Sequence, residues 1–225
     1  MKKVRVWDLP TRLFHWTLAA LIVVAIVTQN IGGNAMEWHF RAGYAALALL
    51  AFRILWGLVG SRYARFASFL YHPSTIVGYL RGSKDALKKK YLGHNPLGSL
   101  SVFALLGVVL AQAVTGLFAN DDIAYDGPLV RFISKELSDK ITWFHKDVSA
   151  TLIYVLVGVH LAAVAFYYFR KRQNLVKPMI TGDHEVDFDA PAANDSWAVR
   201  LFALTLLTAC AGGVYYLVSL PQPTV

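Results

Sequence analysis

Charged residues are scarce in this chain, and cysteine is almost absent. Only 16% of its 225 residues are Asp, Glu, Lys or Arg, whereas 56% are hydrophobic. Such a chain cannot cover itself with an ordinary soluble surface, so the composition indicates an integral membrane protein. The one cysteine, Cys210, can form neither an internal disulfide nor a thiolate cluster. Iron–sulfur centres and structural zinc sites are therefore excluded.

Long hydrophobic runs, in contrast, occur five times. A helix needs about 20 apolar residues to cross roughly 30 Å of hydrocarbon, and its backbone groups are then bonded internally. The short alternating strands of outer-membrane barrels do not occur. We predict an all-α integral membrane protein, with a four-helix transmembrane bundle in residues 1–182, a solvated acidic connector and a peripheral fifth transmembrane helix. The predicted helices span residues 14–31, 40–59, 97–119, 142–169 and 197–220, and the connector spans 183–196.

Lysine and arginine lie mainly on one predicted side of the membrane. The first apolar run is longer than the core of a signal peptide and has no small-residue cleavage site before Glu37, so we expect it to remain as a helix. Because basic loops stay in the cytoplasm, the N-terminus is predicted to be cytoplasmic and the C-terminus periplasmic. The basic segments contain Lys2, Lys3, Arg5 and Arg12; Arg62, Arg65, Arg81, Lys84 and the lysines at 88–90; and Arg170, Lys171 and Arg172. The third loop instead carries Asp121, Asp122, Asp126, Glu136 and Asp139.

The formal net charge of +8 follows from this arrangement. Basic segments at a cytoplasmic membrane surface contact anionic membrane lipid, and this explains the lysine run at 88–90. A nucleic-acid partner is not predicted.

Four of the seven histidines lie where the apolar segments begin, end or cross the membrane. On the predicted topology, His15 lies near the cytoplasmic end of the first helix and His39 at the outer end of the second. His145 and His160 share the fourth helix, about 22 Å apart along its axis and roughly 60° apart around it. Pairing by depth predicts His39 with His145 near the outer side and His15 with His160 near the inner side.

Two such pairs are what two haem irons need as axial ligands. Iron between two imidazoles has no open position, which favours electron transfer over catalysis at the metal. Ionisable groups within a membrane span are functional by default, although a hydrogen bond to a backbone carbonyl is the alternative for His160. His94 has no partner at a matching depth, so we expect a structural or propionate-contacting role for it.

Four motifs along the chain point to one family when they are taken together. They are VWDLPTRLFHW at 6–16, HFRAGY and FRILWGLVGSRYARF within 39–66, GHNPLG at 93–98, and KPMITG at 177–182. Over about residues 5–182 the chain resembles the bacterial cytochrome b561 family, particularly the b-type cytochrome subunit of nickel–iron hydrogenases. The resemblance implies two bis-histidine haem b groups with ligands on the first, second and fourth helices. By motif, these ligands match His15, His39, His145 and His160.

Arginines near these histidines are candidates for binding haem propionates, which call for cationic partners near a membrane interface. Arg41 is the candidate for the outer haem. Arg12 is the candidate for the inner haem, together with Arg62 or Arg65. Arg53, within the second helix, is expected either to contact a propionate or to extend to the cytoplasmic interface.

These features predict a subunit that transfers electrons across the bacterial cytoplasmic (inner) membrane. The two haems would connect a periplasmic redox protein, either a hydrogenase or a cytochrome c, with quinone or quinol. The acidic loop at 121–139 is a hypothesis for the docking surface. Two alternatives stay open: a quinone-linked oxidoreductase acting on a small anion such as superoxide, with Arg41 as a cationic lure, and a non-haem transporter. The sequence leaves open the redox partner, the direction of electron flow, the quinone site and whether the chain forms an oligomer.

Overall fold

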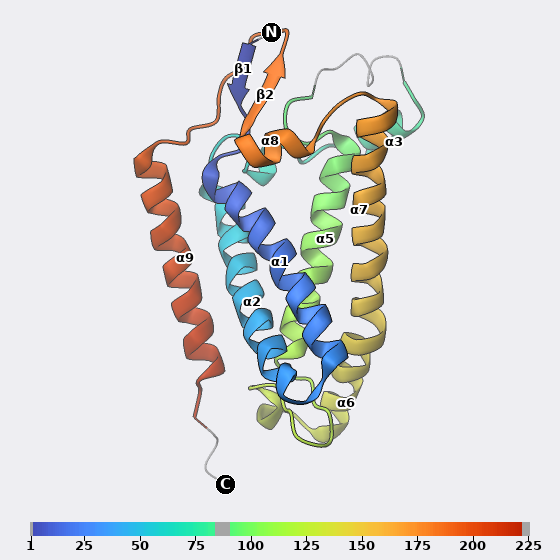
Figure 1. Ribbon diagram of the computed structural model, residues 1–225, viewed down its shortest axis with the longest axis vertical. Helices are drawn as coiled ribbons and strands as arrows, with labels where there is room; N and C mark the ends of the chain where they lie inside the picture. Colours follow the sequence, from blue (N-terminus) through green and yellow to red (C-terminus); the bar gives the residue numbers. More distant parts are fainter. Residues whose placement is uncertain (1, 84–90, 222–225) are drawn as a thin grey trace. The chain divides into compact units, whose positions relative to one another are not determined.

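The computed structural model describes residues 2–83 and 91–221. Lys84 and the lysine run at 88–90, which entered the topology prediction, lie outside the described residues. Within the described residues, five helical stretches are long and apolar enough to cross a membrane, so the chain is an all-α, multi-pass integral membrane protein. The long helices are α1 (Leu9–Ile31), α2 (Met36–Val59), α5 (Pro96–Gly116), α7 (Ala150–Arg170) and α9 (Trp197–Val218) (Figure 1). The shorter elements are β1 (Lys2–Arg5), α3 (Pro73–Leu80), α6 (Lys135–Trp143), α8 (Val176–Thr181) and β2 (Asp183–Val186).

Helix α1 begins at Leu9 rather than at the predicted residue 14, because a polar cap precedes the apolar run. The fully buried Asp8 accepts a hydrogen bond at Oδ1 from the backbone N–H of Thr11, at 2.7 Å. Pro10 occupies the first turn, where its missing N–H is no loss. The Nε1–H of Trp56 donates to Asp8 Oδ2 at 3.1 Å. The motif at 6–16 and the motif within 39–66 are therefore in contact at the start of α1.

The predicted fourth helix is two helices joined by a π-helical turn. Helix α6 ends at Trp143, the π-helical turn covers Phe144–Ser149, and α7 continues from Ala150. Hydrophobicity predicts where the chain is apolar, but it does not register a change from i→i+4 to i→i+5 hydrogen bonding. The predicted 142–169 segment therefore includes this turn and omits most of α6.

Two compact units make up the chain, and each long helix contributes residues to both. Each unit is described below by itself. Unit 1 comprises Met1–Leu13, Arg53–Leu105 and Leu156–Leu204, and unit 2 comprises Phe14–Phe52, Leu106–Val155 and Thr205–Val225.

In unit 1, β1 and β2 form a two-stranded antiparallel sheet beside α8 (Figure 1). Gly182 ends α8 at a φ of 88°, and its carbonyl accepts hydrogen bonds from the N–H groups of Val6 and Trp7, at 2.8 and 3.1 Å. A Cβ atom at Gly182 would lie 2.7 Å from the carbonyl oxygen of Trp7. Glycine is therefore required at the end of the KPMITG motif for two reasons. The backbone adopts a left-handed conformation there, and the Trp7 carbonyl leaves no room for a Cβ atom.

The acidic connector is only partly solvated, which corrects the prediction. Its last carboxylate, Asp195, has a side chain only 7% exposed, and its Oδ2 binds Arg5 at 2.7 Å and Arg200 at 3.0 Å. Asp195 Oδ1 accepts the N–H of Leu9, at 3.0 Å. Burial alone would raise the pKa of Asp195, but the hydrogen bonds from Arg200 and Leu9 and the charges of Arg200 and Arg5 lower it overall. Asp189, 89% exposed, keeps the predicted solvated character.

Unit 2 combines an apolar core with a polar network around Asn120. Its core brings together α2, α5, the following loop and α9. Beside the core lies Asn120, only 6% exposed, whose side-chain amide donates to Ser138 Oγ at 2.6 Å. Its backbone N–H donates to Thr142 Oγ1 at 3.0 Å. The loop after α5 is thereby fastened to α6. The buried core residues are Leu47, Ala48, Leu117, Leu129 and Val214.

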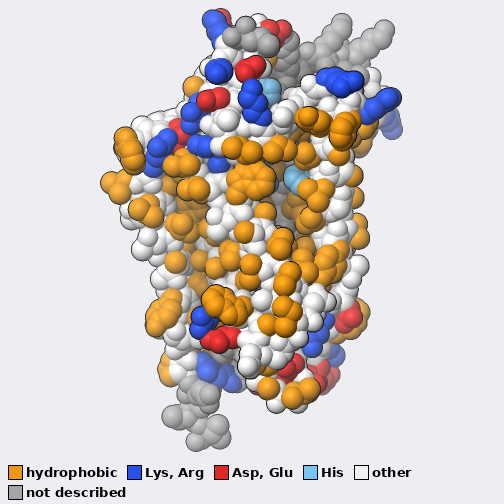
Figure 2. All heavy atoms as spheres, viewed as in Figure 1, with side chains coloured by type: hydrophobic (Ala, Val, Ile, Leu, Met, Phe, Trp, Pro, Cys, Tyr) orange, Lys and Arg blue, Asp and Glu red, His pale blue; other side chains and the backbone are white. Residues whose placement is uncertain are grey.

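Large apolar side chains remain exposed along the spanning helices. Examples are Leu161 on α7, 61% exposed, and Leu201 on α9, 65% exposed. On the face seen in Figure 2, hydrophobic side chains cover much of the helices, and Lys and Arg side chains gather at the end of unit 1 that carries β1, β2 and α8. Such surfaces suit contact with lipid tails and headgroups, respectively.

Candidate cofactor site

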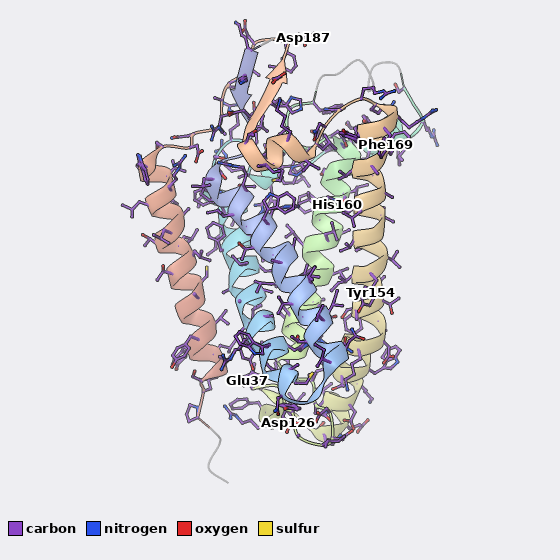
Figure 3. All side chains as sticks on the ribbon, in the orientation of Figure 1. Glu37, Asp126, Tyr154, His160, Phe169 and Asp187 are labelled. Carbon is purple, nitrogen blue, oxygen red and sulfur yellow. The ribbon has the colours of Figure 1, made fainter. Side chains whose placement is uncertain are left out.

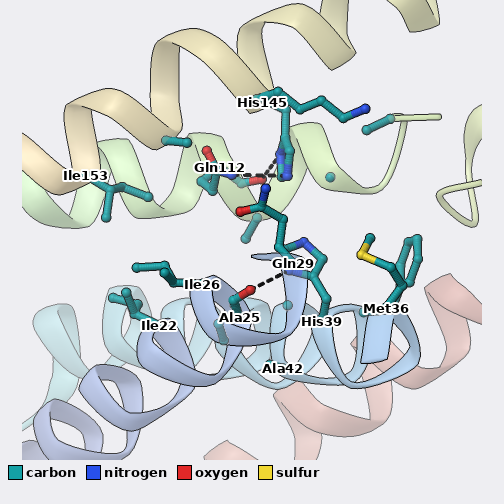
Figure 4. A pocket seen from close by; sticks show the side chains of 18 of the residues that line it. Ile22, Ala25, Ile26, Gln29, Met36, His39, Ala42, Gln112, His145 and Ile153 are labelled. Carbon is teal, nitrogen blue, oxygen red and sulfur yellow. Dashed lines mark hydrogen bonds between the residues drawn. The ribbon is translucent and has the colours of Figure 1, made fainter. Parts of the chain in front are cut away.

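A cavity of about 170 Å³ lies entirely within unit 2. Residues of α1, α2, α5, the π-helical turn and α7 line it, and most of them are apolar. The side chains of His39 and His145 point into this cavity from opposite sides (Figure 4). The structure thus brings together the two histidines that were predicted to form the outer pair.

His39 is oriented by the backbone of α1. Its Nδ1 lies 2.9 Å from the carbonyl oxygen of Ala25. A carbonyl can only accept, so Nδ1 carries the proton and donates it, and Nε2 keeps its lone pair. Metal-binding histidines are typically held in this way, with the other ring nitrogen bonded to a carbonyl or carboxylate.

His145 has the same arrangement on the opposite wall. Its Nδ1 lies 3.0 Å from the carbonyl oxygen of Gln112, on α5, and its Nε2 therefore keeps a lone pair. The side-chain amide nitrogen of Gln112 lies 3.0 Å from that Nε2 and donates to it. The amide oxygen of Gln112 accepts from Ser149 Oγ. An iron bound at Nε2 would replace the Gln112 amide as its partner.

The two imidazoles are spaced for one metal ion between them. Their ring centroids lie 6.3 Å apart, and the ring planes are 84° to each other. With a metal–nitrogen bond of about 2 Å, two imidazoles on opposite sides of one ion have centroids roughly 6 Å apart. Gly116 gives the ring of His145 its room, since a Cβ there would lie 3.0 Å from His145 Cε1. The residues present therefore fit a haem iron held by His39 and His145.

The π-helical turn corrects the calculation that placed His145 and His160 roughly 60° apart. That angle assumed a continuous α-helix of 3.6 residues per turn. His145 lies within Phe144–Ser149, where the wider i→i+5 turn changes the direction of the side chains. The π-helical turn was missed because the sequence carries no proline or glycine there to signal it. Gln112 was also missed, although an amide within an otherwise apolar span was an available signal.

The inner pair is distributed over the two units. His15 belongs to unit 2, where its ring lies edge-on to Trp16 at 5.0 Å between centroids. His160 lies on α7 in unit 1 (Figure 3). Each is partly buried. Their pairing stays a prediction.

The structure places the three predicted arginines in different surroundings. Arg41 is 58% exposed, forms an ion pair with Glu37, and is not among the described residues that line the cavity. Arg12, 14% exposed, donates from one terminal nitrogen to the carbonyl oxygen of Ile180 at 2.6 Å. Arg53 is only 3% exposed, with its guanidinium 4.7 Å from the ring centroid of Phe66. The side chain of Arg53 therefore packs inside unit 1 rather than extending to an interface.

His94 packs within unit 1 as an aromatic ring. Its centroid lies 4.8 Å from that of Trp7 and 4.5 Å from that of Phe69. The next residue, Asn95, caps α5, because its Oδ1 accepts the N–H of Gly98 at 2.8 Å. The GHNPLG motif thus supplies a helix cap and a packed ring.

The fold and this site define a class: a helical membrane protein that can hold a metal-centred cofactor between its spans by two imidazoles. Residues 6–182 match the family model described as prokaryotic cytochrome b561, and the chain belongs to that family. Cytochromes of the b type bind haem b, so membership implies haem b and a role in membrane electron transfer.

Curated relatives carry a consistent description. A probable Ni/Fe-hydrogenase B-type cytochrome subunit of Azotobacter chroococcum mcd 1 is 29% identical, over 84% of this chain and 91% of the relative. Another from Bradyrhizobium diazoefficiens is 25% identical, over 81% of this chain and 86% of the relative. A probable Ni/Fe-hydrogenase 1 B-type cytochrome subunit of Escherichia coli K12 is 27% identical, over 49% of this chain and 57% of the relative. No solved structure matches the chain.

Proposed function

We propose that this chain is the membrane subunit that transfers electrons between a periplasmic redox protein and the quinone pool, with two haem b groups held by histidine pairs. When bound, haem supplies an iron that accepts and donates one electron at a time. The observation that carries the proposal is the His39–His145 pair, with 6.3 Å between ring centroids and each Nδ1 bonded to a backbone carbonyl.

The protein groups around the outer pair have defined tasks. The carbonyls of Ala25 and Gln112 hold the two rings and fix the proton on Nδ1, so that both Nε2 atoms are ligands. The apolar lining excludes water and lowers the local dielectric constant, which tunes the reduction potential. Two imidazole ligands leave no position for oxygen or substrate at the metal. This arrangement suits electron transfer.

We further propose that His15 and His160 hold the second haem, with Arg12 as a propionate partner. The family motif at 6–16 and the intramembrane position of His160 support this assignment. In the same proposal the chain lies in the bacterial cytoplasmic membrane with its N-terminus inside and its C-terminus outside. The lysine and arginine residues of the N-terminal segment and of the loop after α7 support that orientation.

The direct test is the haem content per chain, with a reduced-minus-oxidised spectrum of the purified protein. The wild type is expected to contain two b-type haems. His39→Ala and His145→Ala are each expected to remove the same one, and His15→Ala and His160→Ala the other. His72→Ala is the matched control, because His72 caps α3 at an exposed position and lies outside both pairs.

The outcomes separate the parts of the proposal. Loss of both haems in His39→Ala, with a folded protein by circular dichroism, would contradict two independent sites. A wild type that holds one haem, which His39→Ala loses and His15→Ala keeps, would remove the His15–His160 site and keep the outer one. A wild type without haem would remove the electron-transfer proposal altogether.

A hydrogenase is the periplasmic partner that we propose, because the relatives' names carry it. The acidic loop offers less free charge for docking than its composition suggests. Asp121 Oδ1 accepts three backbone N–H groups of its own loop, which lower its pKa, and Asp122 binds Lys135 at 2.5 Å. If neutralising Asp126 leaves partner reduction and its salt dependence unchanged, the loop is not the docking surface.

The superoxide alternative loses its main support. Arg41 was its cationic lure, but Arg41 is paired with Glu37, so its positive charge is largely balanced. Family membership also argues against the non-haem transporter.

A further inference from the structure

A second cavity, of about 340 Å³, lies entirely within unit 1, where α2 ends and α9 begins. Its lining includes the apolar side chains of Trp56, Val59 and Phe202. Its polar lining residues include Ser61, Arg62 and Arg65, and no histidine or carboxylate is among the described residues that line it.

The two arginines bring uncompensated positive charge to this cavity. Arg62 and Arg65 follow directly after the last turn of α2, and both are exposed. In the described part of the chain, neither forms an ion pair. The nearby carboxylate of Asp195 is already bound by Arg5 and Arg200. Two guanidinium groups at one cavity favour an anion with several acceptor oxygens, which describes a phosphate.

Ser61 lines the same cavity and carries a buried, unsatisfied polar group. The residue is only 7% exposed, and its Oγ has no hydrogen-bond partner among the described residues. A buried hydroxyl is nearly always hydrogen-bonded, so its isolation calls for a partner outside the chain. A phosphate oxygen is an acceptor for this hydroxyl.

The apolar lining residues indicate what kind of molecule carries the phosphate. Val59 and Phe202 are 56% and 50% exposed, and their neighbours Leu58 and Leu201 are 64% and 65% exposed. These side chains belong to spanning helices and offer contact to hydrocarbon. A ligand that fills this cavity therefore needs an anionic head and an apolar tail.

We propose that this cavity binds the phosphate group of an anionic phospholipid, through Arg62, Arg65 and Ser61, with an acyl chain along Val59 and Phe202. None of the histidines of either predicted pair lines this cavity, and Arg62 and Arg65, which the sequence offered as alternatives for an inner haem propionate, are assigned here to the lipid phosphate instead. A bound lipid at this place fills the space between α2 and α9 and stabilises the contact between them.

The test uses the full chain in neutral detergent, with co-purified lipid removed. Phosphatidylglycerol is titrated while the thermal unfolding midpoint is recorded, and retained lipid is counted by native mass spectrometry. Phosphatidylcholine and inorganic phosphate are titrated in parallel. We expect a saturable rise in the midpoint with phosphatidylglycerol, and a much smaller one with phosphatidylcholine or inorganic phosphate.

The variants identify the site. Arg62→Gln with Arg65→Gln is expected to weaken phosphatidylglycerol binding about tenfold or more, since each basic group near an anionic lipid contributes substantially. The matched control is Arg81→Gln with Arg170→Gln, which removes two exposed arginines of unit 1 that do not line the cavity. This control is expected to bind lipid like the wild type.

Ser61→Ala provides a further check that a general loss of structure would not mimic. It is expected to weaken lipid binding without lowering the midpoint of the lipid-free protein, because its hydroxyl has no partner in the described chain. Equal binding by the Arg62/Arg65 variant and the wild type would overturn the proposal. Saturation by inorganic phosphate at the affinity of the lipid would overturn the assignment to a phospholipid.

Discussion

Different kinds of interaction join the segments within each of the two units. In unit 1, charged groups join segments far apart in the sequence, as in the Arg5–Asp183 and Arg5–Asp195 pairs at 2.6 and 2.7 Å. In unit 2, the link between the loop after α5 and α6 centres on the neutral side chain of Asn120, which donates to Ser138 Oγ at 2.6 Å and also to Asp139 Oδ1 at 3.0 Å. The imidazoles of His39 and His145 are likewise held by neutral backbone carbonyls.

The difference follows from the polarity of the segments that each unit contains. Unit 1 contains the N-terminal segment and the acidic connector, which are polar and can satisfy charges at a membrane surface. The cavity of unit 2 lies among apolar spans, where an unpaired charge is costly. Backbone carbonyls orient the two histidines there without adding a charge of their own.

The largest expected effect in this comparison comes from Asp195→Ala. The substitution leaves Arg5 and Arg200 without this carboxylate and removes the acceptor of the Leu9 N–H. Breaking such a buried network costs about 3 kcal/mol. We expect a clear fall in the thermal unfolding midpoint.

Asp189→Ala is the control for this substitution. Asp189 belongs to the same connector and pairs with Lys2, but its side chain is 89% exposed. Exposed pairs contribute roughly 0–1 kcal/mol. Equal midpoints for the two variants would show that the charged network of unit 1 does not stabilise it.

The polar network of unit 2 is tested by Asn120→Ala. The change leaves Ser138 Oγ without the Asn120 amide, and a lost buried hydrogen bond of this kind costs about 1–3 kcal/mol. Because Asn120 itself is neutral but also bonds Asp139 and Lys135, its effect is expected to depend on salt less than that of Asp195→Ala. Asn30→Ala, at an exposed position of α1, is the control with little effect. If the fall in the unfolding midpoint depended on salt as strongly for Asn120→Ala as for Asp195→Ala, the proposed difference between the units would be wrong.

Gly116→Ala tests the fit around His145. The added Cβ would lie 3.0 Å from His145 Cε1, so the ring has to shift. Crowding of this kind costs about 1–2 kcal/mol, equivalent to roughly tenfold weaker haem retention. Gly107→Ala, on the same helix, has open space around its Cβ and is expected to retain haem normally. Equal haem loss in the two variants would point to helix propensity rather than ring displacement; unchanged retention in both would show that the ring tolerates the methyl group.

The smallest expected effect is a pH dependence in unit 1. The pKa of Asp195 is lowered in the folded protein, so its contribution to stability is present above its unfolded pKa, about 3.9, and is lost as the pH falls through the folded value. The midpoint difference between wild type and Asp195→Asn should be constant above about pH 5 and shrink below about pH 4. A difference that persists unchanged at pH 3 would show that the charge of Asp195 is not what stabilises the contact.

The membrane class, the approximate spans and the four candidate histidines could be predicted from the residues alone, because hydropathy is a local property of each segment. The sequence also identified the family, since the motifs at 6–16, 39–66, 93–98 and 177–182 can be read without a fold. The motifs did not show which structural roles their residues have. Asp8 is a helix cap bonded to Trp56, and Gly182 is a left-handed C-cap beside Trp7.

The partners of those residues became known from the folded structure. The carbonyl that orients His39 belongs to Ala25, and the groups that surround His145 come from Gln112 and Thr115 on α5. The composition of the connector predicted a solvated segment, yet Asp195 is buried against the chain's first residues. Hydrogen bonds and ion pairs depend on atoms brought together from distant parts of the chain, and no local pattern of residues encodes their positions.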